Sequence, residues 1–226
     1  MNSADATQRE GGSAQRTRVK ICGITNPADA ESAISLGADA LGFNAWSGSK
    51  RFIDLIRAGD WIRELAPFVA RVAVLVNASR AEAESVFDLP FIDCVQFHGN
   101  EDAEFCGYFA AQNRPFIKAI ALKDTDSPAG LERFATRNIL VDSHSEAGFG
   151  GTGRLIDLDL AERLATTHRG IRLILSGGLS PDNAAEAIRR VRPFAVDVAT
   201  GVEAGPGKKD SGKMRAFMEA VRSAQE

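Results

Sequence analysis

The sequence has few of the residue types that build metal centres and disulfide frameworks. It has three histidines and three cysteines, and the cysteines (Cys22, Cys94 and Cys106) show no CxxC spacing. An odd, widely spaced set of cysteines excludes a disulfide framework and does not match a zinc-site pattern. We therefore expect no metal ion and a reducing, cytoplasmic location. No apolar run approaches the roughly 18 residues of a spanning helix, so no membrane segment is predicted.

An excess of charge of one sign is also lacking. The formal net charge is −3, from 27 basic and 30 acidic residues. A nucleic-acid-binding or membrane-surface protein usually carries a basic excess or a basic patch. We therefore expect neither a nucleic-acid partner nor a membrane partner, whereas a small anion could still be bound by local groups.

The length and the hydrophobic content of the chain predict one folded domain, preceded by a polar N-terminal segment. The chain has 226 residues, of which 44% are hydrophobic, enough for one sizeable core. Residues 1–16 are polar and lack the apolar centre of a signal peptide, so they are predicted to form a disordered tail. The folded domain is expected to span residues 17–226.

Short apolar runs alternate with helical patterns throughout this domain. Continuously apolar runs are typical of parallel strands that are covered on both faces. The predicted strands are 19–22, 40–44, 72–76, 94–97, 116–119, 139–142, 173–176 and 195–199. The predicted helices are 28–36, 55–65, 81–87, 101–111, 129–134, 158–166, 184–191 and 213–223. This alternation predicts an α/β fold, a single-domain (β/α)8 TIM barrel, with an open doubly wound sheet as the alternative.

Glycines follow the seventh and eighth predicted strands directly, in the segments SGGLSPDN and ATGVEAGPG. In a barrel, the loops at the carboxyl ends of the strands form the functional site, and these two loops often bind phosphate. Gly177, Gly178 and Gly201 would let backbone N–H groups approach an anion. The alternative is that these glycines only make tight turns.

A third glycine-rich segment, GFGGTG at 148–153, matches GxGxxG. It begins six positions after Asp142 and late in the chain, which is unlike a dinucleotide-binding fold. A Walker loop would need Lys and Ser or Thr where Arg154 and Leu155 stand. We interpret the segment as a hinged loop that closes over a substrate.

Cys22 and Asp142 both stand at the carboxyl end of a predicted strand. A thiol and a carboxyl that face one pocket could act as base and acid. Lys20 points to the same side of its strand as Cys22 and could favour a thiolate. A buried, inert Cys22 and a helix-capping Asp142 are the alternative.

Six motifs appear in order: KICGIT, GADALGF, VQFHGNE, GGTG, SGGLSPDN and VDVATGVEAGPGKKD. Together they resemble the phosphoribosylanthranilate isomerase family of tryptophan biosynthesis. The resemblance implies a (β/α)8 barrel that carries out an Amadori rearrangement of N-(5-phosphoribosyl)anthranilate without a metal or an organic cofactor. Its only partner would be this small-molecule substrate, and the enzyme would be a monomer or a homodimer.

The resemblance also implies roles for individual residues. Cys22 corresponds to the family's general base and Asp142 to its general acid. Arg51, in SGSKRFI, corresponds to the arginine that holds the anthranilate carboxylate, although relatives commonly have Ser-Pro-Arg there. Gly177, Gly178, Gly201 and Thr200, which stands where serine is commoner, would hold the phosphate. Asp197 is a candidate for contact with the anthranilate nitrogen, or it hydrogen-bonds only within the barrel.

Three further residues near these loops have two interpretations each. His98 could line the pocket or have a structural role, Trp46 could stack near the substrate ring, and Glu203 is interpreted as orienting the last loop. Two other functions stay open: a related sugar-phosphate isomerase of histidine biosynthesis, whose two aspartates differ from Cys22 and Asp142, and a catalytically silent phosphate-binding barrel.

Overall fold

The computed structural model describes residues 16–122, 128–143, 156–168 and 170–225. The predicted N-terminal tail, apart from Arg16, and the GFGGTG segment lie outside the described residues.

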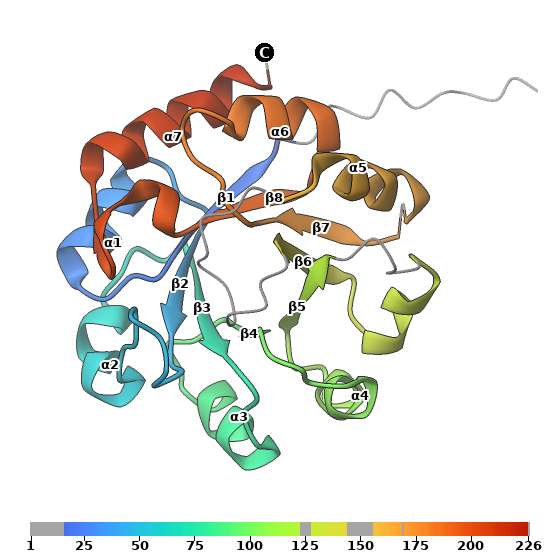
Figure 1. Ribbon diagram of the computed structural model, residues 1–226. Coiled ribbons are helices and arrows are strands. Elements are labelled where there is room, and N and C mark those ends of the chain that lie inside the picture. The colour runs from blue at the N-terminus through green and yellow to red at the C-terminus, as the bar shows by residue number, and fades with distance from the viewer. Residues whose placement is uncertain (1–15, 123–127, 144–155, 169, 226) are drawn as a thin grey trace, which may run out of the picture.

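Eight parallel strands close into a barrel in the order β1 to β8, and helices surround it (Figure 1). The strands are β1 (Arg18–Cys22), β2 (Ala40–Asn44), β3 (Ala70–Leu75), β4 (Cys94–Phe97), β5 (Phe116–Leu122), β6 (Asn138–Ser143), β7 (Arg172–Leu175) and β8 (Ala195–Val198). The α-helices are α1 (Pro27–Ser35), α2 (Leu55–Arg63), α3 (Arg80–Phe87), α4 (Ala103–Ala111), α5 (Leu158–Thr167), α6 (Ala184–Val191) and α7 (Ser211–Ser223). The predicted barrel is confirmed, and the open doubly wound sheet is wrong because β1 pairs with both β2 and β8.

Local sequence signals set where several helices begin. At α1, the side chain of Asn26 accepts a hydrogen bond from the backbone N–H of Asp29, and Pro27 is the first helical residue. At α3, Ser79 and Glu82 form a reciprocal capping box. These caps satisfy backbone N–H groups that have no partner inside the helix, and so they fix the position of each helix start.

The fifth strand is followed by a 3-10 helix, η1 (Pro128–Phe134), where the sequence predicts an α-helix. The described part of the chain therefore has seven α-helices rather than the eight predicted. The segment is short and contains Pro128 and Gly130, two residues that favour an α-helix poorly. Leu131 and Phe134 of η1 are nevertheless buried, so the segment covers the barrel as a helix would.

The alternation of side chains along each strand separates two layers of buried residues. Outward-facing residues such as Val19 and Ile21 pack under the helices in the main core. Inward-facing residues fill the barrel itself, with an apolar cluster of Val72, Ile117, Ala119, Leu140, Ile174 and Ala195. Because the period of a strand is two, Lys20 and Cys22 share the inward face of β1.

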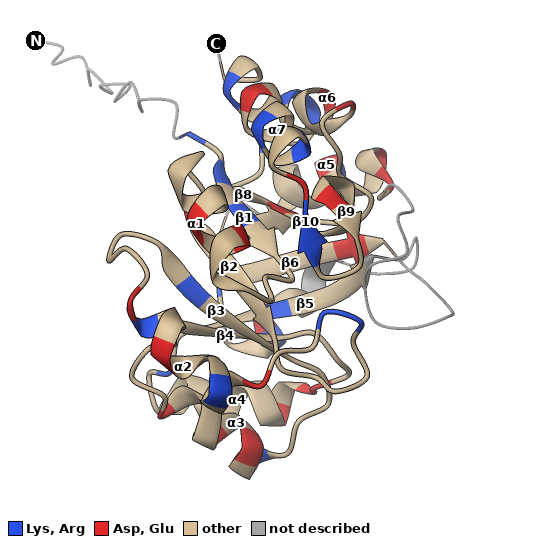
Figure 2. Ribbon diagram, turned by 90° about the vertical axis from the view of Figure 1, so that its left-hand side faces the viewer, with Lys and Arg blue, Asp and Glu red and all other residues tan. Residues whose placement is uncertain are grey.

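A small antiparallel hairpin that was not expected from the sequence follows β8. After the 3-10 turn η2 (Thr200–Val202), β9 (Glu203–Gly205) pairs with β10 (Lys208–Lys209). In Figure 2, which colours the ribbon by residue type, basic and acidic positions are mixed on this side of the molecule, and β10 lies beside β9. Among the described residues, no helix is long and apolar enough to cross a membrane.

Candidate active site

A cavity of about 470 Å³ opens at the carboxyl ends of the strands. This volume suits a small phosphorylated ligand. The structure brings all of the predicted site residues to its wall: Cys22, Arg51, Asp142, Gly177, Gly178, Asp197, Thr200 and Gly201. Trp46 and His98 line it as well. The predicted site residues at the carboxyl ends of the strands therefore share one cavity.

Cys22 is the last residue of β1, and its side chain packs over Gly42 of β2. Cys22 and Gly42 are paired residues of the two strands, and a Cβ on Gly42 would lie 2.6 Å from the Cys22 sulfur. Burial raises the pKa of the Cys22 thiol, and the nearby Asp197 carboxylate raises it further. The ammonium groups of Lys20 and Lys209 act in the opposite direction, because each positive charge favours the thiolate.

Lys20 and Asp197 form a buried ion pair in the barrel, immediately below Cys22. The Lys20 Nζ donates to Asp197 Oδ1 over 2.8 Å, and the two side chains are only 4% and 5% exposed. Ser176 Oγ lies 3.4 Å from the other oxygen of Asp197. Burial alone lowers the pKa of Lys20, but Asp197 and Cys22 more than offset this and raise it above its ordinary value. Lys20 is therefore a fixed positive charge at neutral pH.

Asp142 stands on the inward face at the end of β6 and is almost fully buried. Its Oδ1 accepts a hydrogen bond of 2.8 Å from the backbone N–H of Ser143. Its Oδ2 lies 3.4 Å from His98 Nε2, and the other ring nitrogen of His98 is 2.6 Å from Gln96 Nε2. His98 therefore lines the cavity beside Asp142 and is also hydrogen-bonded to Gln96, so the two interpretations do not exclude each other.

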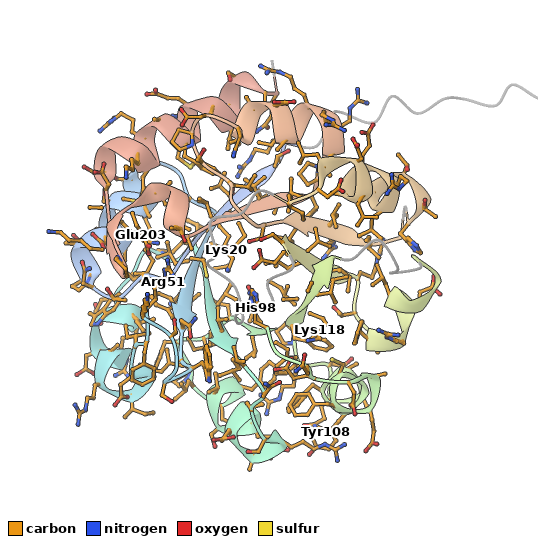
Figure 3. All side chains as sticks on the ribbon, viewed as in Figure 1. Lys20, Arg51, His98, Tyr108, Lys118 and Glu203 are labelled. Atoms are coloured by element: carbon orange, nitrogen blue, oxygen red, sulfur yellow. The ribbon has the colours of Figure 1, made fainter. Side chains whose placement is uncertain are left out.

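Arg51, on the loop after β2, is held by Glu203 at the start of β9 (Figure 3). Arg51 Nε and Nη2 donate to the two oxygens of Glu203, each over 2.7 Å. Nη2 also lies 3.0 Å from Thr200 Oγ1. Glu203 thus links the eighth loop to the arginine of the second loop, which is more than the orienting role within its own loop that the sequence suggested.

Lys209 completes this cluster from β10. Its Nζ donates to Glu203 Oε1 over 3.0 Å and to the backbone carbonyl of Cys22 over 2.6 Å. It also donates to the carbonyl of Ala199 over 3.2 Å. Lys209 was not expected from the sequence, because its burial depends on a hairpin that folds back over the end of β1.

The glycines of the seventh and eighth loops let backbone segments approach closely. Gly177 and Gly178 have φ values of +91° and +65°, a region that favours glycine. A Cβ on Gly177 would lie 2.6 Å from the Ser143 nitrogen and 2.9 Å from Asp142 Oδ1. A Cβ on Gly201 would overlap the carbonyl oxygen of Leu179. Gly177 and Gly201 therefore do more than shorten turns. Gly177 lets the loop after β7 approach the end of β6, and Gly201 lets the loop after β8 approach the loop after β7.

Among the described residues, no group of three or more His, Cys, Asp or Glu side chains could hold a metal ion. The polar groups of the cavity are instead arranged as separate units. A thiol with its lysine stands at β1, a carboxyl with its histidine at β6, and an arginine at the loop after β2.

Comparison with known proteins agrees with this arrangement. The sequence profile of the N-(5'-phosphoribosyl)anthranilate (PRA) isomerase family matches residues 19–220. The isomerase of Pseudomonas aeruginosa is 43% identical over 208 residues, which cover 91% of this chain and 95% of that protein. The crystal structure of the Thermus thermophilus enzyme superposes with a TM-score of 0.82 at 35% identity, covering 92% of this chain and 99% of that one.

A further solved structure is a phosphoribosyl anthranilate isomerase in complex with reduced 1-(o-carboxyphenylamino)-1-deoxyribulose 5-phosphate. It superposes with a TM-score of 0.76 at 37% identity, covering 92% of this chain and 99% of that chain. The family profile spans nearly all of the described barrel, including the strands that carry Cys22 and Asp142. The chain belongs to the N-(5'-phosphoribosyl)anthranilate isomerase family.

Proposed function

We propose that this chain converts N-(5'-phosphoribosyl)anthranilate into 1-(2-carboxyphenylamino)-1-deoxyribulose 5-phosphate in tryptophan biosynthesis. Membership of the family supports the reaction, and a relative of the same fold binds a reduced form of this product. The observation that carries the proposal is the shared cavity. Cys22 and Asp142 line it from β1 and β6, two strands that are not neighbours in the barrel.

Asp142 is proposed as the general acid of the first step. In its protonated form it would donate a proton to the ring oxygen of the ribose. The bond between C1 and that oxygen then breaks, and the nitrogen lone pair forms the C=N bond of a Schiff-base cation. His98, 3.4 Å from Asp142 Oδ2, would orient the carboxyl group.

Cys22 is proposed as the general base of the second step. As a thiolate it would take the proton from C2. The electron pair of that C–H bond would form the C1=C2 bond of an enolamine, and the π electrons of the C1=N bond would return to the nitrogen. Protonation at C1 and loss of the hydroxyl proton at C2 then give the ketone. Because acid and base act on different atoms of one small sugar, they need to stand on separate strands.

The remaining site residues are proposed to hold the two ends of the substrate. Arg51 would bind the anthranilate carboxylate through Nη1, because Glu203 holds the other two nitrogens of its planar guanidinium. The loops that carry Gly177, Gly178, Thr200 and Gly201 would hold the phosphate. Asp197 would contact the anthranilate nitrogen, because it lines the cavity with 5% of its surface exposed.

The test is the decay of substrate fluorescence with freshly made N-(5'-phosphoribosyl)anthranilate. We expect rapid turnover by the wild type and a loss of about 10²–10⁴-fold in kcat for both Cys22→Ser and Asp142→Asn. Cys94→Ser is the matched control, because Cys94 is the first residue of β4 and the cavity opens at the carboxyl ends of the strands. Full activity in Cys22→Ser would place the base elsewhere.

Absence of wild-type turnover, with ribose 5-phosphate still bound, would contradict the reaction itself and favour a silent barrel or another sugar phosphate. We propose that the working unit is a monomer or a homodimer with the small molecule as its partner. Sedimentation of the active enzyme distinguishes the two states.

A further inference from the structure

Two residues apart on the inward face of β1, Lys20 and Cys22 converge on Gly42. A Cβ at Gly42 would lie 2.6 Å from the Cys22 sulfur and 3.0 Å from the Lys20 nitrogen. The missing side chain of Gly42 therefore makes the space that both groups share, and Figure 3 shows Lys20 near the centre of the barrel. The positive charge of the ammonium group lowers the pKa of the Cys22 thiol, against the effect of burial.

Asp197 holds the Lys20 ammonium from the neighbouring strand β8. Lys20 and Asp197 are paired residues of β1 and β8, and their side chains are 2.8 Å apart. Both side chains are almost fully buried, so water competes little for the contact between Lys20 and Asp197. Lys20 thus has one fixed carboxylate on one side and the Cys22 thiol on the other.

We infer that Lys20 is a positioning residue for the proposed base: its ammonium, fixed by Asp197, holds Cys22 over Gly42 and favours the thiolate form of Cys22. This inference rests on the proposed function for its catalytic meaning, but the effect of Lys20 on the thiol is a property of the free protein. The Asp197 carboxylate itself disfavours the Cys22 thiolate, because it adds a negative charge nearby.

Other charged groups also lie near Cys22, and their effects on the thiol have to be distinguished from that of Lys20. Lys209 on β10 donates to the Cys22 carbonyl, and the Arg51–Glu203 pair lies beside the Gly23 backbone. Strand β2 contributes only Gly42 at this level. Lys209 contacts the backbone rather than the space above Gly42, so Lys20 is the cation that shares the side-chain position of Cys22.

The test is the rate of alkylation of Cys22 by iodoacetamide between about pH 7 and pH 10, followed by mass spectrometry of the peptide that contains Cys22. Without Lys20, the buried thiolate loses its nearest cation, so Lys20→Met should react at least about tenfold more slowly at neutral pH.

Lys118→Met is the matched control. Lys118 is also a buried lysine on a strand, paired with Glu101 over 2.8 Å, but it has no contact with Cys22. It should leave the alkylation profile of Cys22 unchanged. If Lys20→Met reacts like the wild type, the inference is wrong. Should Lys20→Met fail to fold, Lys20→Gln, which removes the charge and keeps a polar group for Asp197, decides in its place.

The pH profile of kcat/KM separates this inference from the proposed role of Cys22. If Cys22 is the base, the acidic limb of the profile should move to higher pH in Lys20→Met, together with the alkylation profile. A shift in alkylation without a shift in the rate profile would support the action of Lys20 on the thiol and overturn Cys22 as the base.

Discussion

Arg51 and Glu203 are 152 residues apart in the chain and form a two-pronged ion pair at the mouth of the barrel. The pair uses Arg51 Nε and Nη2, with both distances at 2.7 Å, and the Arg51 side chain is 15% exposed. Glu203 therefore fixes the plane of the guanidinium. The remaining nitrogen, Nη1, is the one that we expect to meet the anthranilate carboxylate.

Replacing Arg51 by Lys should weaken substrate binding. Lysine keeps the positive charge but loses the planar fork that contacts Glu203 and a carboxylate at the same time. We expect KM for N-(5'-phosphoribosyl)anthranilate to rise about 10–100-fold. Ribose 5-phosphate has no carboxylate, so its inhibition constant should not change. An equal loss for both ligands would show that Arg51 maintains the whole site rather than the carboxylate position.

Glu203→Gln removes a charge and keeps the shape of the side chain. Arg51 and Lys209 would both lose their charged acceptor in a buried place, so we expect a loss of about 2 kcal/mol in the free energy of unfolding. KM should rise while kcat changes less, since the chemistry is assigned to Cys22 and Asp142. Steady-state kinetics and urea unfolding measure the two effects. An unchanged KM would mean that Arg51 binds the substrate equally well without the ionised Glu203.

The strands and most helices could be predicted because their signals are local. The predicted strand 94–97 and the predicted helix 184–191 have the same limits as β4 and α6. Apolar runs, N-cap residues and Pro27 act over a few residues, so they can be recognised without knowledge of the tertiary fold. The segment after β5 was predicted as an α-helix because its apolar spacing is helical, although Pro128 and Gly130 favour a tighter turn.

The position of the site could also be predicted, since the carboxyl ends of parallel strands meet at one end of a barrel. The connections between its residues could not. The contact of Lys209 with the Cys22 carbonyl joins residues 187 positions apart, and no sequence pattern marks it. The buried pair of Lys118 and Glu101 could not be predicted either. Both contacts depend on loop conformations that only tertiary packing determines.

The close approach of the last two loops gives a test of the phosphate site. Gly201→Ala would place a methyl group on the carbonyl oxygen of Leu179, a backbone atom that cannot rotate away. We expect the loops to separate and the inhibition constant of inorganic phosphate to rise at least about tenfold. Gly205→Ala is the matched control, because its Cβ would meet no atom within 4 Å. Equal phosphate affinity in both variants would remove Gly201 from the phosphate site.

The charge of Glu203 should also appear in the pH dependence of stability. Burial on its own would raise the pKa of Glu203, but the hydrogen bonds and charges of Arg51 and Lys209 outweigh it and leave the pKa below the ordinary 4.5. The unfolded chain therefore takes up this proton at a higher pH than the folded protein does. The stability that Glu203 contributes is fully present above about pH 4.5 and is lost as the pH falls through the lower, folded-state pKa.

The contribution of Glu203 can be measured as the difference in unfolding free energy between the wild type and Glu203→Gln. The free energy of unfolding of the wild type should exceed that of Glu203→Gln at about pH 6, and the difference should shrink steadily below about pH 4.5. Other carboxylates titrate in both proteins alike, so the difference isolates Glu203. Urea unfolding at a series of pH values measures it. A difference that stays constant down to about pH 3 would mean that the ionised form of Glu203 is not what stabilises the fold.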